Sequence, residues 1–307
     1  MKNLAKQLTA FSLVLLIFTS CKKKTEAVPL EAQTFLNVAY GSGTLRTMDV
    51  YLPANRTSNT SVIVFVHGGS FIGGDKNDYT ILANELVKKD FAVLNINYPL
   101  VDATGLYDSP TKHQKSAVLV QNQVADVGAV VDYAISKAKE WQVSESKIAL
   151  AGHSAGATLA LLYTYGNQNT NKVKVVANLA GALDQTFIDI PNYSTVLPSY
   201  ILEAGYRYTG FEVNPANDQY YKAISPLYVA NAGKKIPTLT IFPELNSVGG
   251  LPKQDRNTFN AFTTQLNNLG VPNKFVQIAG ASHELSRVAD LVTVMNELVA
   301  YFNSNLK

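Results

Sequence analysis

The pentapeptide GHSAG, at residues 152–156, carries a serine between two glycines in the pattern G-x-S-x-G. The apolar run KIALAG precedes Ser154, and the helix-forming run AGATLALLYTYG follows it. The pattern needs its glycines for steric reasons, because a serine on a sharp strand-to-helix turn has strained backbone geometry and neighbouring elements pack close on both sides. This context indicates that Ser154 is a nucleophile.

A serine hydroxyl is a poor nucleophile without a neighbouring base, and the chain offers four histidines. His153 lies inside the turn and points away from the required position, and His67 belongs to a glycine-rich loop. His113 lies in an irregular polar stretch, SPTKHQK, with no strand before it. His283 follows the last strand-like run, KFVQIAG, where a parallel sheet can bring a base to the serine. We therefore expect His283 to act as base and then as acid.

A second glycine-rich segment, HGGSFIGGD at residues 67–75, follows the apolar run SVIVFV. Attack on an acyl carbon creates negative charge on the carbonyl oxygen, and preorganised backbone N–H groups stabilise that charge. Gly68 and Gly69 can donate at close range because they have no Cβ, and the N–H of Ala155 directly follows the nucleophile. We expect these three residues to form an oxyanion hole.

The elements that must position these residues alternate between strands and helices. Strands are expected in TFLNVAY, LRTMDVYLP, SVIVFVH, FAVLNINY, KIALAGH, KVVANLAG, IPTLTIF and KFVQIAG. Helices are expected in YTILANELVKKD, 115–141, AGATLALLYTYG, TFNAFTTQLNNLG and RVADLVTVMNELVAYF. This alternation predicts an α/β fold with a mostly parallel sheet and helices on both faces. Ligands bind beyond the carboxyl ends of such strands, where the three reactive segments should meet.

The N-terminal residues predict export. Residues 1–21 have two lysines, an apolar stretch too short for a typical membrane span, and then the sequence FTSC. The last four residues resemble a bacterial lipobox, in which Cys21, the only cysteine, becomes lipid-modified. We expect a lipoprotein signal peptide over 1–21, a tether over 22–33, one folded domain over 34–307, and anchoring to a bacterial membrane that faces the periplasm or cell surface.

Composition gives no case for a nucleic-acid partner. Of the 307 residues, 47% are hydrophobic and 16% are charged, and the formal net charge is only +3. Three adjacent lysines at 22–24 supply part of this excess. A basic surface stripe is therefore not expected.

The segments HGGSFIGGD, NINYPL, GHSAGA, SPLYV…IPTLTIF and GASHEL resemble the α/β-hydrolase superfamily. They look like its carboxylesterase branch with an HGG oxyanion loop, which includes hormone-sensitive-lipase-like and feruloyl-esterase-like enzymes. The resemblance covers about residues 62–302. It implies an α/β-hydrolase fold with an eight-stranded sheet, and a serine esterase that forms an acyl-enzyme without cofactor or metal. Small, aryl or carbohydrate-linked esters are the implied substrates.

The resemblance fails at one position. Family members usually carry HGxxD after the penultimate strand, and its aspartate orients the histidine. Here the stretch reads FPELNSVGGLP. We expect Glu244, the only carboxylate in that loop, to be the third catalytic residue. The alternatives, in order, are Asn246, Asp184 and Asp255.

A tyrosine-rich segment, about 184–225, occupies the place where family members carry a small cap over the active site. Its aromatic residues either contact an aryl or sugar group or only pack the cap against the core. Two other functions remain open. One is a catalytically degenerate binding protein on a hydrolase fold, and the other is an amidase or peptidase that uses the same residues.

Overall fold

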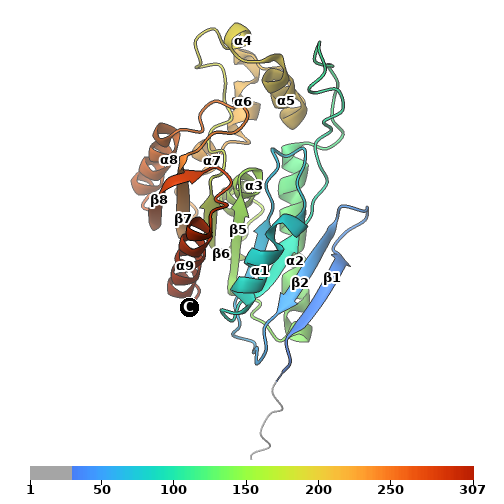
Figure 1. Cartoon of the computed structure of the whole chain (residues 1–307), viewed down its shortest axis with the longest axis vertical. Helices are drawn as coiled ribbons and strands as arrows, with labels where there is room; N and C mark the ends of the chain where they lie inside the picture. Colours follow the sequence, from blue (N-terminus) through green and yellow to red (C-terminus); the bar gives the residue numbers. More distant parts are fainter. Residues whose placement is uncertain (1–29) are drawn as a thin grey trace, which may run out of the picture.

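The computed structural model describes residues 30–307, so the expected signal peptide, Cys21 and residues 22–29 of the tether lie outside the described residues. One eight-stranded sheet, in the order β1-β2-β4-β3-β5-β6-β7-β8, forms the centre of the molecule (Figure 1). Its strands are β1 (Gln33–Ala39), β2 (Thr47–Leu52), β3 (Val62–Val66), β4 (Ala92–Ile96), β5 (Ile148–His153), β6 (Val173–Leu179), β7 (Thr238–Leu245) and β8 (Asn273–Ser282).

The six strands from β4 to β8 in this order run parallel, whereas β2 pairs in the antiparallel sense with both β1 and β4. The carboxyl ends of β3, β5 and β8 therefore share one edge of the sheet. The predicted α/β fold, with a mostly parallel sheet and helices on both faces, is confirmed. No helix within residues 30–307 is both long and apolar enough to cross a membrane.

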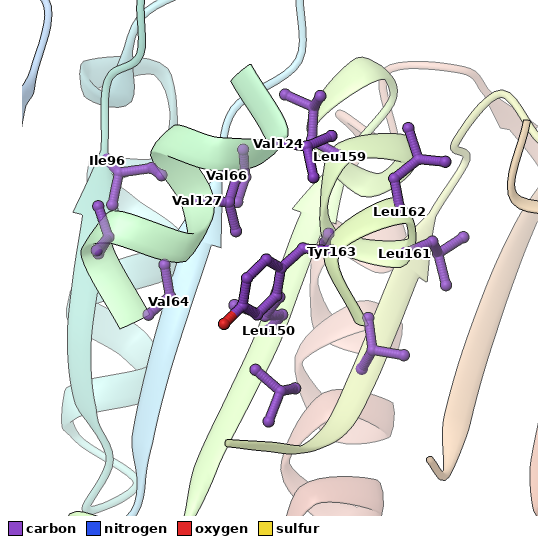
Figure 2. Packing of buried hydrophobic residues seen from close by; sticks show 14 of the residues in the cluster. Val64, Val66, Ile96, Val124, Val127, Leu150, Leu159, Leu161, Leu162 and Tyr163 are labelled. Atoms are coloured by element: carbon purple, nitrogen blue, oxygen red, sulfur yellow. The ribbon is translucent and has the colours of Figure 1, made fainter. Parts of the chain in front are cut away.

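Two apolar cores lie on opposite faces of the sheet. Side chains alternate along β3, so that Val64 and Val66 join one core while Ile63 and Phe65 join the other. The first core packs under α2 (Val120–Trp141), α3 (Ala155–Tyr165) and α8 (Arg256–Asn268), and Figure 2 shows the part beneath α2 and α3. The second packs under α1 (Thr80–Val87) and α9 (Val288–Asn305), which lie in front of the sheet in Figure 1.

The segment between β6 and β7 contains the cap-like insertion expected at about 184–225, and it is called the cap below. Its elements are α4 (Tyr193–Val196), α5 (Ser199–Thr209), the 3-10 turn η2 (Pro215–Asn217), α6 (Asp218–Lys222) and α7 (Pro226–Val229). The helices α4, α5 and α6 lie beyond one end of the strands (Figure 1). Phe187, Ile201 and Tyr221 form a small apolar core of their own within it.

A fully buried arginine joins the cap to the loop between β4 and α2. Arg207, on α5, pairs with Glu203 at 2.7 Å and donates to the backbone carbonyls of Asp102, Thr104 and Lys112 at 2.6–2.9 Å. These hydrogen bonds compensate for the water that the guanidinium loses on burial. The cap and the loop are therefore held together as one unit.

Two element boundaries differ from the sequence predictions. The helix expected from residue 115 begins at Val120, because the side chain of Asn122 accepts the N–H of Leu119 at 2.8 Å and fixes the start of the helix there. The strand expected to end at Phe242 continues to Leu245. This second difference changes the active site, because it moves Glu244 from the loop into the strand.

Candidate active site

Ser154 occupies the sharp turn between β5 and α3. Its backbone angles, φ 51° and ψ −124°, lie in a region that non-glycine residues rarely adopt. Its N–H donates to the carbonyl of Leu179 at 2.8 Å, and its own carbonyl accepts the N–H of Ala157 at 3.0 Å. The half-buried serine is therefore held at the carboxyl edge of the sheet, at the mouth of a cavity.

The two glycines of the turn are sterically required. A Cβ on Gly156 would lie 2.1 Å from the carbonyl oxygen of Val66, and a Cβ on Gly152 would lie 2.5 Å from the backbone of Gly156. Helix α3 thus packs directly against the ends of β3 and β5. The spacing of the glycines in GHSAG follows from this contact.

The glycine-rich loop passes beside the serine. A Cβ on Gly68 would lie only 3.1 Å from the Cβ of Ser154. Gly69, Ser70 and Phe71 then all have positive φ, at 116°, 52° and 66°. Ser70 and Phe71 are not glycines, so these angles are strained, and they persist only where surrounding contacts hold the backbone in place.

Side chains that the sequence analysis did not identify hold this loop. The hydroxyl of Tyr208, from the cap, donates to the carbonyl of Ser70 at 2.8 Å. The amide of Gln123, on α2, donates to the carbonyl of Phe71 at 2.8 Å. Tyr98 donates to the carbonyl of His67 and stacks on its ring. Only the folded chain brings these distant residues to the loop.

The three expected oxyanion donors have different backbone surroundings. Ala155 is the first residue of α3, so its N–H has no partner within the helix, and the positive end of the helix dipole lies there. Gly69 lies in the strained part of the loop. Gly68 differs, because its N–H hydrogen-bonds the buried Tyr79 hydroxyl and thereby opposes the rise that burial causes in the pKa of Tyr79.

His283 follows β8 and lines the same cavity as Ser154. Its Nδ1 lies 2.6 Å from Oδ1 of Asn246. Because an amide oxygen only accepts hydrogen bonds, Nδ1 carries the proton and Nε2 keeps a lone pair. His283 is therefore in the tautomer that a general base requires.

The orientation of the Asn246 amide is also determined. Its Nδ2 donates to the carbonyl of Gln254 at 2.7 Å, which turns Oδ1 towards the imidazole. The neighbouring Lys253 fastens this stretch to the cap through Asp184 at 2.9 Å and Asp189 at 2.7 Å. The pocket beside His283 is thus shaped for an amide, since a carboxylate there would face the Gln254 carbonyl.

Glu244 does not contact His283, so the expectation that it orients the histidine is wrong. Because β7 continues to Leu245, Glu244 is an exposed strand residue, and its carboxylate accepts the N–H of Gly280 at 2.7 Å. Asp184 pairs with Lys253, and Asp255 accepts the N–H of Thr258 at 3.1 Å at the start of α8. Asn246, the second-ranked candidate, occupies the position.

His153 has a structural contact that its sequence position did not reveal. Its Nε2–H donates to the carbonyl of His283 at 2.8 Å, because a carbonyl only accepts, and its Nδ1 accepts from the Tyr79 hydroxyl at 2.8 Å. Burial lowers the pKa of His153, so the ring is neutral. It ties the serine turn to the backbone that carries His283.

The charge state of His283 follows from its surroundings. Burial lowers its pKa to about 3, and the neighbouring His153 imidazole adds to this effect. A carboxylate partner would oppose burial, but Asn246 carries no charge. His283 is therefore a neutral base across the physiological range.

The cavity has a volume of about 790 Å³, within the usual range for ligand sites. Ser154, His283 and the Gly68–Ser70 stretch line one part of it. Within residues 30–307, no group of three or more His, Cys, Asp or Glu side chains is arranged to hold a metal ion. The residues present offer a nucleophile, a base and backbone donors.

Solved structures share this architecture. A bifunctional GH43-CE protein of Bacteroides eggerthii aligns with a TM-score of 0.70 and 20% identity over 89% of this chain and 35% of that chain. A thermophilic esterase of Thermogutta terrifontis aligns with a TM-score of 0.64 and 18% identity over 89% of this chain and 91% of that one. A putative alpha/beta hydrolase of Acanthamoeba polyphaga mimivirus is 22% identical over 78% of this chain and 65% of its own length. The protein has the α/β-hydrolase fold.

One family model and several curated relatives match part of the chain. The BD-FAE family matches residues 48–197, which include Ser154 and the glycine loop but not Asn246 or His283. Kynurenine formamidase of Salmo salar is 28% identical over 47% of this chain and 43% of its own length. A probable isoprenylcysteine alpha-carbonyl methylesterase of Arabidopsis thaliana is 29% identical over 40% and 23%. The matched stretch thus spans less than half of the length of these relatives.

The neutral state of His283 can be tested by NMR. We expect the protein labelled with ¹⁵N-histidine to show His283 with a protonated Nδ1 and an unprotonated Nε2 from pH 8 down to pH 5, because its pKa is about 3. Asn246→Asp should raise that pKa, since a negative charge beside the ring favours the imidazolium. A wild-type His283 that titrates near its ordinary pKa of about 6.5 would contradict this assignment.

Proposed function

We propose that this protein hydrolyses carboxylic esters through Ser154. The observation that carries the proposal is a serine on a strained strand–helix turn that shares a cavity with a histidine fixed as the Nδ1–H tautomer by Asn246. The esterase names among the relatives and neighbouring structures support the same reaction class.

The reaction begins when Ser154 Oγ attacks the ester carbonyl carbon and its proton passes to Nε2 of His283. The new C–O bond pushes the carbonyl electron pair onto oxygen, where the N–H groups of Gly69 and Ala155 stabilise it, with Gly68 beside them. Collapse of this intermediate re-forms the carbonyl and expels the alcohol oxygen, which takes the proton from Nε2. Water then attacks the acyl-enzyme by the same route, releasing the acid and restoring Ser154.

Asn246 supplies orientation without charge. Its amide oxygen holds the imidazole in the reactive tautomer, as the asparagine of papain-like proteases does for a histidine paired with cysteine. It does not neutralise the imidazolium that forms during the reaction. The proposal therefore includes a lower rate than an aspartate would support, with activity that persists into mildly acidic solution because His283 stays neutral there.

Amide hydrolysis is a second candidate, favoured by the formamidase name of two relatives. An amide needs stronger leaving-group protonation than an aryl ester does. His283 serves both reactions in the same role. Comparing an anilide with the aryl ester of the same acid separates the two candidates, because an amidase cleaves both at useful rates whereas an esterase cleaves only the ester.

A catalytically degenerate binding protein is the remaining alternative, and the replacement of the usual carboxylate by Asn246 favours it. A fluorophosphonate probe distinguishes it from both hydrolases. The probe modifies only an activated serine, so a binding protein would stay unlabelled.

The first prediction concerns the nucleophile. Ser154→Ala should lower turnover of 4-nitrophenyl acetate at least about a thousandfold and abolish fluorophosphonate labelling, because residual catalysis by the oxyanion donors is small compared with the full machinery. Thr158→Ser, one turn along α3, serves as the control and should remain active. Ordinary activity or labelling in Ser154→Ala would place the nucleophile elsewhere.

The second prediction separates the two candidate partners of His283. Asn246→Ala should reduce kcat about a hundredfold or more, because the imidazole then loses the acceptor that fixes its tautomer. Glu244→Gln should leave kcat within about threefold, because the exposed Glu244 side chain accepts a hydrogen bond from the Gly280 N–H and none from His283. Thermal melts of both variants control for folding. The reverse pattern of kcat values would restore Glu244 as the catalytic partner.

We also propose that the protein is exported and anchored through lipid on Cys21. The lipobox-like FTSC supports this proposal, and stable anchoring needs more than one acyl chain, as bacterial lipoproteins have. Cys21→Ser should move the protein from the membrane fraction to the soluble fraction or leave it unprocessed. Equal solubility of the wild type and the variant in cell fractionation would refute the proposal.

A further inference from the structure

The cavity that holds Ser154 continues away from the cap into an apolar groove between α1 and α9. These two helices pack side by side on the same face of the sheet (Figure 1). Both begin near the carboxyl edge of the strands, so the groove starts beside the reactive residues. Ile81 and Leu82 line it from α1, and Val288, Leu291, Val292 and Met295 line it from α9.

Helix α9 has a second apolar stripe that is largely exposed, although Met295 at its end packs against the second core. Val294, Leu298 and Phe302 face the sheet and are fully or almost fully buried. The groove residues Val288, Leu291, Val292 and Met295 follow the i, i+3, i+4, i+7 spacing of another helix face. Val288 is 78% exposed and Val292 is 53% exposed, and Ile81, across the groove, is 75% exposed.

Isolated exposed apolar residues need no explanation, but a contiguous set does. Here the set belongs to the same cavity as Ser154 and His283, so anything lying in the groove reaches the nucleophile. Four charged residues line the cavity, namely Asp78, Glu85, Lys89 and Glu284, but the residues named above that face each other from α1 and α9 are all apolar. The groove therefore matches an uncharged hydrocarbon group that is attached to the ester undergoing hydrolysis.

We propose that the α1–α9 groove binds the hydrocarbon part of the substrate, so that the preferred substrates are esters with a medium-length alkyl or an alkyl-aryl group. This proposal rests on the proposed function of Ser154. Ile81 and Val288 are the residues that set the length preference. The hydrocarbon belongs either to the acid or to the alcohol, and the experiment distinguishes the two.

The test measures kcat/KM for two substrate series. One is 4-nitrophenyl acetate, butyrate and octanoate, and the other is ethyl, butyl and octyl acetate. A fully buried methylene corresponds to about a fourfold gain in affinity, so a half-covered chain should raise kcat/KM at least about tenfold from the shortest to the longest member. A rise in the first series assigns the groove to the acyl group, and a rise in the second assigns it to the alcohol.

The variant is Ile81→Asp combined with Val288→Asp. Both positions lie in the first turn of a helix, where a carboxylate suits the helix dipole, so folding should be preserved. The double variant should lose the tenfold preference for the long member, because the groove then presents carboxylates to the alkyl chain. Leu36→Asp, at a 63% exposed position on β1 outside the cavity, is the control and should keep the wild-type preference.

A binding measurement separates this proposal from the proposed function. Calorimetry with Ser154→Ala should detect octyl acetate or 4-nitrophenyl octanoate, and binding should weaken at least about tenfold when Ile81→Asp and Val288→Asp are added. Absent binding, or an unchanged length preference in the double variant, overturns the groove proposal and leaves the esterase proposal standing. A wild type that is a dimer by light scattering, while the double variant is a monomer, also overturns it, because the groove is then an interface between copies. Binding without any hydrolysis would refute only the esterase proposal.

Discussion

The active site depends on one steric constraint, the direct backbone contact between the start of α3 and the ends of β3 and β5. At Gly156 there is no room for even a methyl group, because the carbonyl oxygens of Val66 and His67 occupy that space. This contact forces the chain through the strained angles of Ser154 and brings the glycine loop beside it. Strained angles at Ser154, Ser70 and Phe71 cost on the order of 1–3 kcal/mol each, against a total stability of about 5–15 kcal/mol for a domain. Only a densely packed surrounding, such as the apolar core under α2 and α3, can maintain them.

The sequence was sufficient for the parts of the site that follow directly from strand ends. Ser154, His283 and Gly69 each come after a strand of a parallel sheet, so strand order and polarity bring them together without further information. The alternation of strands and helices was equally readable, because the two faces of β3 contribute apolar residues to two cores.

The residue that hydrogen-bonds His283 could not be predicted from strand order in this way. The length of β7 is decided by its pairing with β8, including the irregular register between Pro243 and Leu245, and local propensity does not record that pairing. Because β7 is three residues longer at its end than expected, Glu244 lies in a strand instead of in the following loop. Tyr208, Gln123 and Tyr79 could not be identified for a related reason, since each acts through hydrogen bonds to residues that are distant in the sequence.

An uncharged partner changes the pH behaviour of folding as well as that of the site. The pKa of His283 is about 3 in the folded chain and near its ordinary value when unfolded. The unfolded state therefore binds more protons below pH about 6.5, and stability falls as the pH drops from there through the folded pKa. The buried His153 contributes in the same direction.

The cap is fastened to the core at two neighbouring positions of α5, and this has an evolutionary consequence. Arg207 binds the loop after β4, and Tyr208 binds the carbonyl of Ser70 within the strained glycine loop. Substitutions at exposed positions elsewhere in the cap leave these two connections in place. Substitutions at these two positions would also disturb the backbone donors beside the nucleophile. Divergence of substrate range in related chains should therefore spare residues 207 and 208 while the rest of the cap varies.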